Sequence, residues 1–304
     1  MCGNEVRTDF MGRRVIIASN RVKRPHDFAA KRSIVKPKIC FFCPGNEHLT
    51  PPEIARVENG KGGWLIRCFP NKFAAVANNF KKAYGFHEVI VETPSHNTTL
   101  SEIPIWQMEK LLWMYTERIK SLEQNPRIQY VLIFKNEGED AGASLGHTHT
   151  QLLASDFVPD LVGRELGAFS EYKKKGKCIF CEMIKNEKRR YIFENSEFIA
   201  FAPYASRFAF ETWIMPKEHI PSITKLQNLE KMAEAMKRVL EKIDNSLNYP
   251  PYNYFLHNAP KGRDFHFHLE ITPRLTKWAG LEIGGDVPIN AMPPEKAARF
   301  LRIH

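Results

Sequence analysis

The sequence is short of long apolar runs and of acidic residues. None of its apolar stretches reaches transmembrane length, and residues 1–5 lack the basic and apolar segments of a secretory signal. We therefore expect a soluble, cytosolic protein with no membrane partner. Lysine and arginine number 44 against 34 acidic residues, and the net charge of +10 favours an anionic partner, either nucleic acid or a phosphorylated small molecule. Charge alone does not choose between the two.

Cysteine is also scarce, and most of it is paired. Four of the six cysteines form two Cys-x-x-Cys pairs, Cys40/Cys43 and Cys178/Cys181. In a cytosolic chain such pairs indicate metal or redox chemistry more often than structural disulfides. The 43% apolar and 12% aromatic content excludes a disordered chain. The length of 304 residues suggests two domains or one large one.

The two halves of the chain repeat one order of elements. In each half a Cys-x-x-Cys pair precedes two strands, a loop histidine, an amphipathic helix, another strand and a His-x-His motif. The helices are expected at 105–123 and 225–246. The double order predicts an α+β fold of two similar strand-rich modules, at 1–170 and 171–304, made by internal duplication. We expect the lysine-rich segment 172–176 to be a solvated hinge between them.

Each half also supplies two thiolates, one loop histidine and the first histidine of its His-x-His motif. Two sulfur and two imidazole ligands make a closed tetrahedral set that suits zinc and leaves no position for a catalytic water. We therefore expect two structural Zn²⁺ ions per chain, which also stabilise the fold because their ligands are far apart in sequence. A redox role is the alternative, but neither pair opens a thioredoxin-like βαβ unit. The expected ligands are Cys40, Cys43, His96 and His147, then Cys178, Cys181, His219 and His266.

If zinc binds His147, the second histidine of that motif is free for catalysis. Alternate positions of a strand point to one face, so His147, His149 and Gln151 would lie together. A neutral imidazole can attack phosphorus, which makes His149 the candidate nucleophile. Gln151, Ser144 and the glycine-containing turn 142–146 can donate hydrogen bonds to a phosphoryl group as charge develops.

These motifs resemble a known family. Residues 146–151, Gly-His-Thr-His-Thr-Gln, resemble the His-x-His-x-Gln signature of the galactose-1-phosphate uridylyltransferase branch of the histidine-triad superfamily. Further segments look like that branch in the same order and over nearly the whole chain: 14–17, 21–25, 40–47, 69–73, 134–136, 280–282 and 293–298.

The resemblance implies two tandem histidine-triad-like modules, each an antiparallel sheet with a long helix. It implies a ping-pong reaction in which a nucleoside diphosphate sugar nucleotidylates His149, Gln151 stabilises the intermediate, and a sugar 1-phosphate takes the nucleotidyl group. It also implies a homodimer whose sites borrow residues across the interface. The residues expected around the substrates are Phe69, Asn71, Lys72, Phe73, Asn136, Ser144, Gln151 and Lys277.

Three departures leave the base open. Uridylyltransferases proper usually have proline and glycine where this chain has Thr148 and Thr150, and tend to have aspartate at the place of Lys72. The threonine pattern and the second Cys₂His₂ set are similar to the ADP-glucose phosphorylase relatives, in which phosphate accepts the adenylyl group. Uridylyl transfer between UDP-glucose and a hexose 1-phosphate is the first expectation, and ADP-glucose phosphorolysis is the alternative.

The second half and the reaction class are also open to more than one interpretation. Glu270 stands where the first half has Gln151, and a carboxylate repels a phosphoryl group, so we expect one active strand per chain. A superfamily nucleotide hydrolase would differ only in using water as acceptor. A zinc-containing nucleic-acid-binding protein is disfavoured, because the Cys-to-His separations are far from zinc-finger spacing. The family's second pattern for a further ion would use Glu165, His257, His266 and His268.

Overall fold

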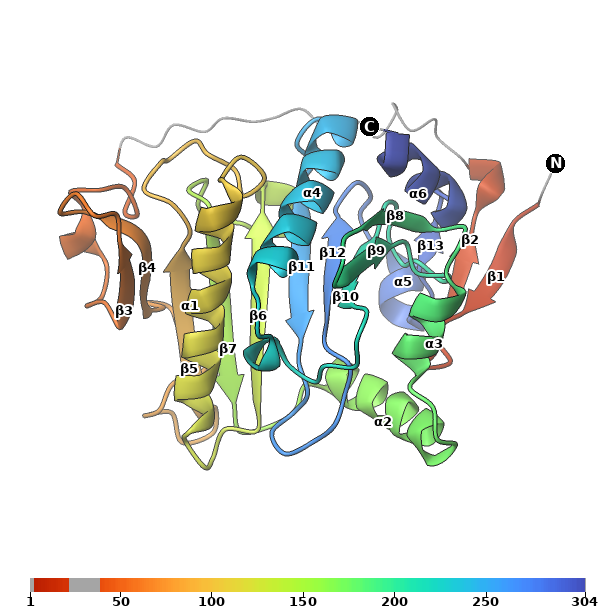
Figure 1. Ribbon diagram of the computed structural model, residues 1–304, viewed down its shortest axis with the longest axis horizontal. Helices are drawn as coiled ribbons and strands as arrows, with labels where there is room; N and C mark the ends of the chain where they lie inside the picture. Colours follow the sequence, from red (N-terminus) through yellow and green to blue (C-terminus); the bar gives the residue numbers. More distant parts are fainter. Residues whose placement is uncertain (1–2, 22–38, 304) are drawn as a thin grey trace.

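A continuous antiparallel sheet forms the centre of the molecule. The computed structural model describes residues 3–21 and 39–303, so the basic segment 22–25 of the family resemblance lies outside the described residues. Within them, ten strands pair in the order β3-β4-β5-β7-β6-β11-β12-β10-β9-β8 (Figure 1). Their bounds are β3 Ala55–Glu58, β4 Trp64–Pro70, β5 Gly85–Val91, β6 Tyr130–Glu137, β7 His149–Ser155, β8 Tyr191–Glu194, β9 Phe198–Phe201, β10 Thr212–Pro216, β11 Tyr252–His257 and β12 His268–Pro273.

The order of the strands shows two matching halves. Reading outward from the centre, β6-β7-β5-β4-β3 corresponds to β11-β12-β10-β9-β8, and the halves join where β6 pairs with β11. The register matches too, because Phe134 lies opposite Gln151 in one half and Phe255 lies opposite Glu270 in the other. The expected α+β fold with two similar modules is confirmed, and the modules share one sheet. The division into domains 1–170 and 171–304 stays a prediction.

One long helix from each half covers the same face of the sheet. Helices α1 (Ile105–Glu123) and α4 (Glu230–Leu247) lie side by side across it (Figure 1). The sequence predicts the bounds of α1 correctly, but α4 begins later than expected, because Ile223–Lys225 form a separate 3-10 turn. The apolar stripe of each helix is buried in the main core: Met108, Leu111, Leu112, Tyr115 and Ile119 from α1, and Met232, Met236, Val239, Leu240 and Ile243 from α4.

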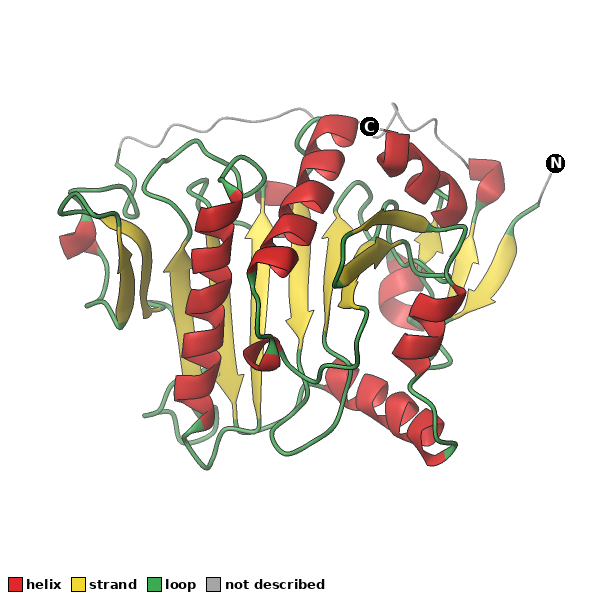
Figure 2. Ribbon diagram, in the orientation of Figure 1, coloured by secondary structure: helices red, strands yellow, loops and turns green. Residues whose placement is uncertain are grey.

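The remaining elements surround this core (Figure 2). In the described part of the chain a smaller sheet consists of β1 (Glu5–Thr8), β2 (Arg14–Ile17) and β13 (Ile289–Asn290). The other helices are α2 (Asp160–Lys174), α3 (Ile179–Asn186), α5 (Gly280–Gly285) and α6 (Pro294–Ile303). Among the described residues, no helix has both the length and the apolar character needed to cross a membrane.

The expectation of a lysine-rich hinge is wrong. Helix α2 continues to Lys174, so most of the segment is helical. Lys173 and Lys174 lie in the last turn, where positive charge interacts favourably with the helix dipole. Lys173 Nζ also lies 2.9 Å from Asp264 Oδ2. The charge run therefore ends a helix instead of interrupting the structure.

Two strand boundaries also differ from those predicted. Strand β6 extends to Glu137, and the turn after it begins at Gly138, whose φ of 80° favours glycine. Strand β7 begins only at His149, so His147 precedes the strand. In the second half β12 likewise begins at the second histidine of its motif, His268. The first histidine of each pair is thereby free to turn toward its cysteines.

Candidate active site

His149 is held in one tautomer by the backbone just before its strand. Its Nδ1 lies 2.9 Å from the carbonyl oxygen of His147, and a carbonyl only accepts, so Nδ1 bears the proton. Nε2 then has the free lone pair. Burial, and next the charge of Lys135, lower the pKa of His149 below its ordinary value, which keeps the imidazole neutral and nucleophilic at neutral pH.

The two His-x-His motifs differ in the access to this nitrogen. His149 is 7% exposed. Among the described residues its Nε2 has no hydrogen-bond partner, and this nitrogen is not fully enclosed. Nε2 of His268 is fully enclosed and has no hydrogen-bond partner within the described part of the chain. Of these two histidines, only His149 therefore has an accessible Nε2 lone pair, and one active strand per chain stays a prediction.

Gln151 lies on the same face of β7 and is oriented by His87, which the sequence reasoning missed. The backbone N–H of Ala75 donates to His87 Nδ1 at 3.2 Å, so His87 Nε2 bears the proton and donates to Gln151 Oε1 at 2.9 Å. Asn71 Nδ2 lies 3.5 Å from the same oxygen. The Gln151 amide nitrogen remains available as a donor. Alternation along 85–91 could have placed His87 on this face, since Val89 lies opposite Gln151.

Aromatic side chains pack against one side of His149. The ring of Phe42, from the turn between Cys40 and Cys43, lies 5.3 Å from the imidazole and 5.6 Å from Phe69 at the end of β4. Phe42 and Phe69 belong to a small apolar cluster with Trp64, Val89 and Val91, separate from the main core. This cluster shields one side of the imidazole from water and strengthens electrostatic contacts there.

Three of the predicted substrate-binding residues lie at the end of β6, in the loop that follows it, or against that loop. Asn136 on β6 accepts a hydrogen bond from Asn253 Nδ2 at 2.9 Å, and that amide also donates to the carbonyl of Ala141 at 2.8 Å. The turn after β6 is thereby tied to the second half of the sheet. Lys277 Nζ lies 3.4 Å from Asp140 Oδ1 in the same turn. Ser144 is exposed further along the loop.

Lys72 and Phe73 are exposed beside Asn71. The side chain of Phe73 is 86% exposed, which is unusual for an aromatic ring with nothing to cover it. Asn71 Oδ1 accepts the backbone N–H of Phe73 at 2.9 Å and so fixes this turn. The roles of all these residues toward substrate stay predictions, although the structure brings Asn71 and Gln151 together.

The first Cys₂His₂ set comes together with the geometry of a metal site. Cys40 Sγ lies 3.4 Å from His147 Nδ1, and Cys43 Sγ lies 3.4 Å from His96 Nδ1. In a tetrahedral zinc site the sulfur and nitrogen ligands are about 3.6 Å apart. His147 Nε2 lies 2.8 Å from the carbonyl of Thr93, which leaves Nδ1 unprotonated and directed toward the sulfurs.

The second set has the same arrangement. His266 Nδ1 lies 3.7 Å from Cys178 Sγ and 3.5 Å from Cys181 Sγ, and His219 Nδ1 lies 3.9 Å from Cys181 Sγ. His266 Nε2 faces the carbonyl of Pro216 at 2.9 Å, and His219 Nε2 faces Asp264 Oδ1 at 2.8 Å. Partners of this kind fix metal-binding histidines. Both cysteine sets can therefore hold a metal ion.

Comparison with known proteins agrees with these motifs. Residues 4–159 match the family model described as "Galactose-1-phosphate uridyl transferase, N-terminal domain", and residues 177–280 match the one described as "Scavenger mRNA decapping enzyme C-term binding". ADP-glucose phosphorylase of Arabidopsis thaliana is 35% identical to this chain, over 98% of this chain and 92% of the length of that protein. The chain belongs to the galactose-1-phosphate uridylyltransferase family.

Two further relatives support this membership. Galactose-1-phosphate uridylyltransferase of Thermotoga maritima is 35% identical over 73% of this chain and 75% of its own. The crystal structure of an ADP-glucose phosphorylase from Arabidopsis thaliana with bound ADP-glucose superposes with a TM-score of 0.88 at 33% identity, covering 99% of both chains. Within the galactose-1-phosphate uridylyltransferase family, this chain is therefore similar to proteins with two different names.

In this family member His268 belongs to a further cluster of buried titratable side chains. Glu165, His257, His268 and Glu270 approach one another within 4.8 Å, and His257 Nδ1 lies 2.9 Å from Glu165 Oε2. The family's second pattern, the alternative to the second cysteine set, combined Glu165, His257 and His268 with His266 and is therefore wrong in one member, because Glu270 stands in the place of His266. His266 lies with the cysteines instead, because its Nδ1 faces their sulfurs.

Arg207 supplies positive charge to this buried group. Its guanidinium pairs with Glu270 and, at 3.0 Å, with Glu211. Burial alone would raise the pKa of Glu270, but Arg207 outweighs it and holds the pKa of that carboxyl well below its usual range. The face that corresponds to the His149 site is thus filled by charged side chains of the chain itself.

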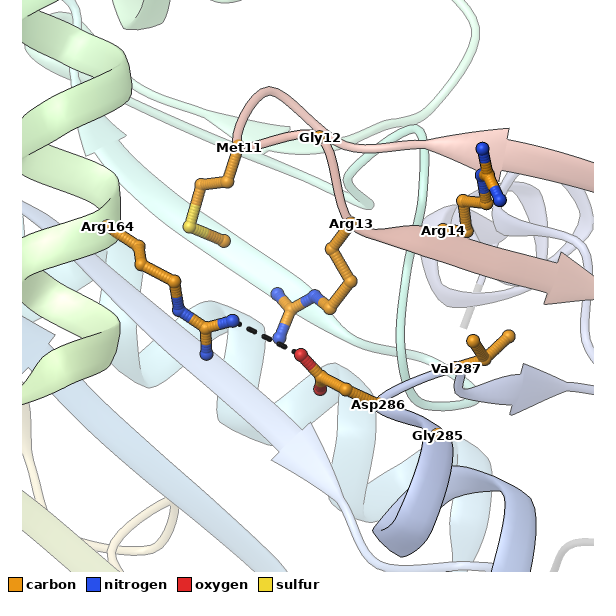
Figure 3. A pocket seen from close by; sticks show the side chains of 8 residues that line it. All are labelled: Met11, Gly12, Arg13, Arg14, Arg164, Gly285, Asp286 and Val287. Atoms are coloured by element: carbon orange, nitrogen blue, oxygen red, sulfur yellow. Dashed lines mark hydrogen bonds and ion pairs between the residues drawn. The ribbon is translucent and has the colours of Figure 1, made fainter.

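A pocket of about 370 Å³ lies elsewhere, between the β1–β2 turn, α2 and the end of α5 (Figure 3). Arg13, Arg14 and Arg164 line it. Arg164 pairs with Asp286 at 3.1 Å, and Arg13 pairs with Asp9 at 3.0 Å. Two of its three guanidinium groups are therefore already neutralised, and none of the predicted site residues lines it.

Proposed function

We propose that this family member is a nucleotidyltransferase that uses His149 as a covalent carrier. The observation that supports it most is the contrast between the two His-x-His motifs, in which only His149 has an accessible Nε2. Next to it stands an amide, Gln151, whose oxygen is already bonded to His87. A nucleophile with a fixed tautomer and a neighbouring neutral donor is the arrangement that phosphoryl-type transfer requires.

The reaction proceeds in two displacements at one phosphorus. His149 Nε2 attacks the α-phosphorus of a nucleoside diphosphate sugar; a nitrogen–phosphorus bond forms, the bridging oxygen–phosphorus bond breaks, and sugar 1-phosphate leaves. An oxygen of the acceptor then attacks the same phosphorus, and the bond electrons return to Nε2. Throughout, Nδ1–H stays bonded to the His147 carbonyl, and the Gln151 amide donates to a non-bridging oxygen. Ser144, which is exposed, and Asn136 are proposed to contact the substrate.

Both Cys₂His₂ sets are proposed to hold Zn²⁺, two ions per chain. Their closed donor sets suit a structural ion, which fastens the Cys-x-x-Cys segment to the start of the catalytic strand or its counterpart. His147 and Phe42 would then be fixed together, and both contact the environment of His149. A homodimer and a cytosolic location stay predictions.

Two substrate pairs have comparable support. Uridylyl transfer between UDP-glucose and a hexose 1-phosphate accords with the family model and the Thermotoga relative. Adenylyl transfer from ADP-glucose to phosphate accords with a relative that matches 98% of this chain, and with the threonines at 148 and 150.

Mass spectrometry of the intact protein tests the proposal. The zinc-loaded protein is mixed with UDP-glucose or with ADP-glucose, without acceptor, and the added mass identifies the nucleotide retained. His149→Ala should retain none, and galactose 1-phosphate or inorganic phosphate should discharge the parent adduct. A label that persists in His149→Ala contradicts the proposal, and so does the absence of any label with every donor. Product formation that needs no acceptor indicates a hydrolase.

A further inference from the structure

A buried polar cluster lies directly behind the catalytic strand. Lys135 Nζ on β6 lies 2.7 Å from Glu92 Oε2, 2.7 Å from Thr148 Oγ1 and 3.1 Å from the carbonyl oxygen of His149. The side chains of Lys135 and Glu92 are both fully buried. They occupy the face that α1 and α4 cover, opposite the imidazole of His149. An ion pair at such a depth loses much hydration energy, so its retention needs a reason.

The cluster continues along the strand through hydroxyl groups. Thr150 Oγ1 donates to Glu92, lies 2.6 Å from the Tyr254 hydroxyl, and lies 2.7 Å from the Tyr115 hydroxyl. The hydroxyl oxygens of Tyr115 and Tyr254 are 2.6 Å apart. Both threonines that flank His149 are thus bonded into one network. Satisfied buried networks of this kind hold a segment rigidly.

The second half of the chain packs the same positions without polar groups. Lys135 lies opposite Thr150 in the register of β6 and β7, and Leu256 lies opposite Leu269 in the matching register of β11 and β12. Leu256 and Leu269 are both buried in the main core. The architecture is therefore compatible with apolar side chains here, which are often as stabilising as a buried ion pair. What distinguishes the polar half is the accessible His149.

The position at which Lys135 contacts β7 indicates the role of its ion pair with Glu92. The pairing of β6 with β7 ends at Lys135 and Thr150, so His149 has no residue opposite it on β6. Lys135 Nζ bonds the carbonyl of His149 at this end of the ladder. The imidazole is in turn bonded to the backbone at His147. Movement of the backbone between 147 and 149 would carry Nε2 away from its line of attack.

We infer that Lys135, paired with Glu92, is a positioning residue that clamps the backbone of the catalytic strand behind His149. It touches no substrate and acts through His149 and Thr148. The inference rests on the proposed function for its catalytic consequence, but the rigidity it assigns to the strand can be measured without any substrate.

The test is a paired substitution, Lys135→Met with Glu92→Leu. Removing both partners imitates the apolar packing of the second half. The charge that loses its partner, Glu137 Oε2 at 3.1 Å from Lys135 Nζ, is partly exposed to solvent, so the double variant should fold. We expect the rate of His149 nucleotidylation at saturating donor to fall by about tenfold to a hundredfold, with a KM change of less than about threefold. Leu256→Met, at the matching position of the second half, is the control and should keep the parent rate.

Hydrogen–deuterium exchange separates this inference from the proposed function. The amides of residues 147–151 should exchange faster in the double variant than in the parent and in Leu256→Met. Unchanged exchange overturns the clamp, and so does faster exchange with a parent rate of nucleotidylation. If the parent protein takes up no nucleotide, the proposed function fails and exchange alone decides whether the clamp exists.

A gentler variant covers the case in which the double substitution does not fold. Thr148→Val has nearly the same shape but removes one hydroxyl bonded to Lys135. It should fold, increase exchange at 147–151 and lower the rate of nucleotidylation by about threefold to tenfold. Parent exchange in a folded Thr148→Val overturns the clamp.

Discussion

Replacing His87 by leucine should slow nucleotidyl transfer without weakening donor binding much. His87 touches Gln151, the side chain of Asn71 and the backbone of Ala75, and no reacting atom is assigned to it. Its Nε2–H occupies the Gln151 oxygen, so the amide nitrogen is directed to the open face. In His87→Leu the amide can rotate and present its oxygen to the anionic phosphoryl group, which repels it.

The magnitude follows from a single neutral hydrogen bond. A bond of 2.9 Å between uncharged groups contributes about 0.5 to 1.5 kcal/mol. If this orienting energy acts only in the transition state, the rate of His149 nucleotidylation falls by about threefold to tenfold. Rapid quenching followed by mass spectrometry measures the rate at saturating donor. The KM should change by less than about twofold, since the lost bond acts on orientation.

Two comparisons make the result decisive. His48→Leu makes the same change at an exposed position and should keep the parent rate. In a Gln151→Ala background, His87→Leu should have almost no further effect, because the residue it orients is gone. Additive effects of the two substitutions, or a parent rate in His87→Leu, would refute the orientation argument.

Three more outcomes are expected. Each cysteine set contains a thiol whose pKa is raised, to about 11 for Cys43 and to about 12 for Cys181, by burial and then by the neighbouring thiol. Because Zn²⁺ must displace these protons, its affinity in chelator competition should fall at least about tenfold for each unit of pH decrease near neutrality. Removal of the ion should also lower the melting temperature of the protein. Gly85→Ala places a Cβ 2.2 Å from a carbonyl oxygen of β7 and should lower the free energy of unfolding by more than about 2 kcal/mol in urea titration, whereas Gly163→Ala, in an open position of α2, should raise it by up to about 1 kcal/mol. Arg207→Met leaves two buried glutamates without their cation and should cost about 3 to 5 kcal/mol in the same titration, a loss that Arg207→Lys should partly restore.

Local patterns identified the elements that depend on short-range chemistry. The observed bounds of helix α1 agree with those predicted, because its apolar spacing follows the helical repeat over the whole element. The repeated order of motifs predicted the two matching halves. The same reasoning failed at residues 172–176, where lysines indicated a hinge and α2 continues instead. Lysine has good helix propensity, so a charge run alone does not distinguish a hinge from a helix end.

The sequence by itself determined the family and the two Cys₂His₂ sets, and it predicted His149 over His147 as the nucleophile, because each depends on residue type and spacing along the chain. Tertiary structure alone decided which imidazole nitrogen is free, that His87 orients Gln151, and that Lys135 and Glu92 meet behind the catalytic strand. The physical reason is that these contacts join strands distant in sequence, and their partners are set by sheet register and burial. Neither quantity is visible in the local order of residues.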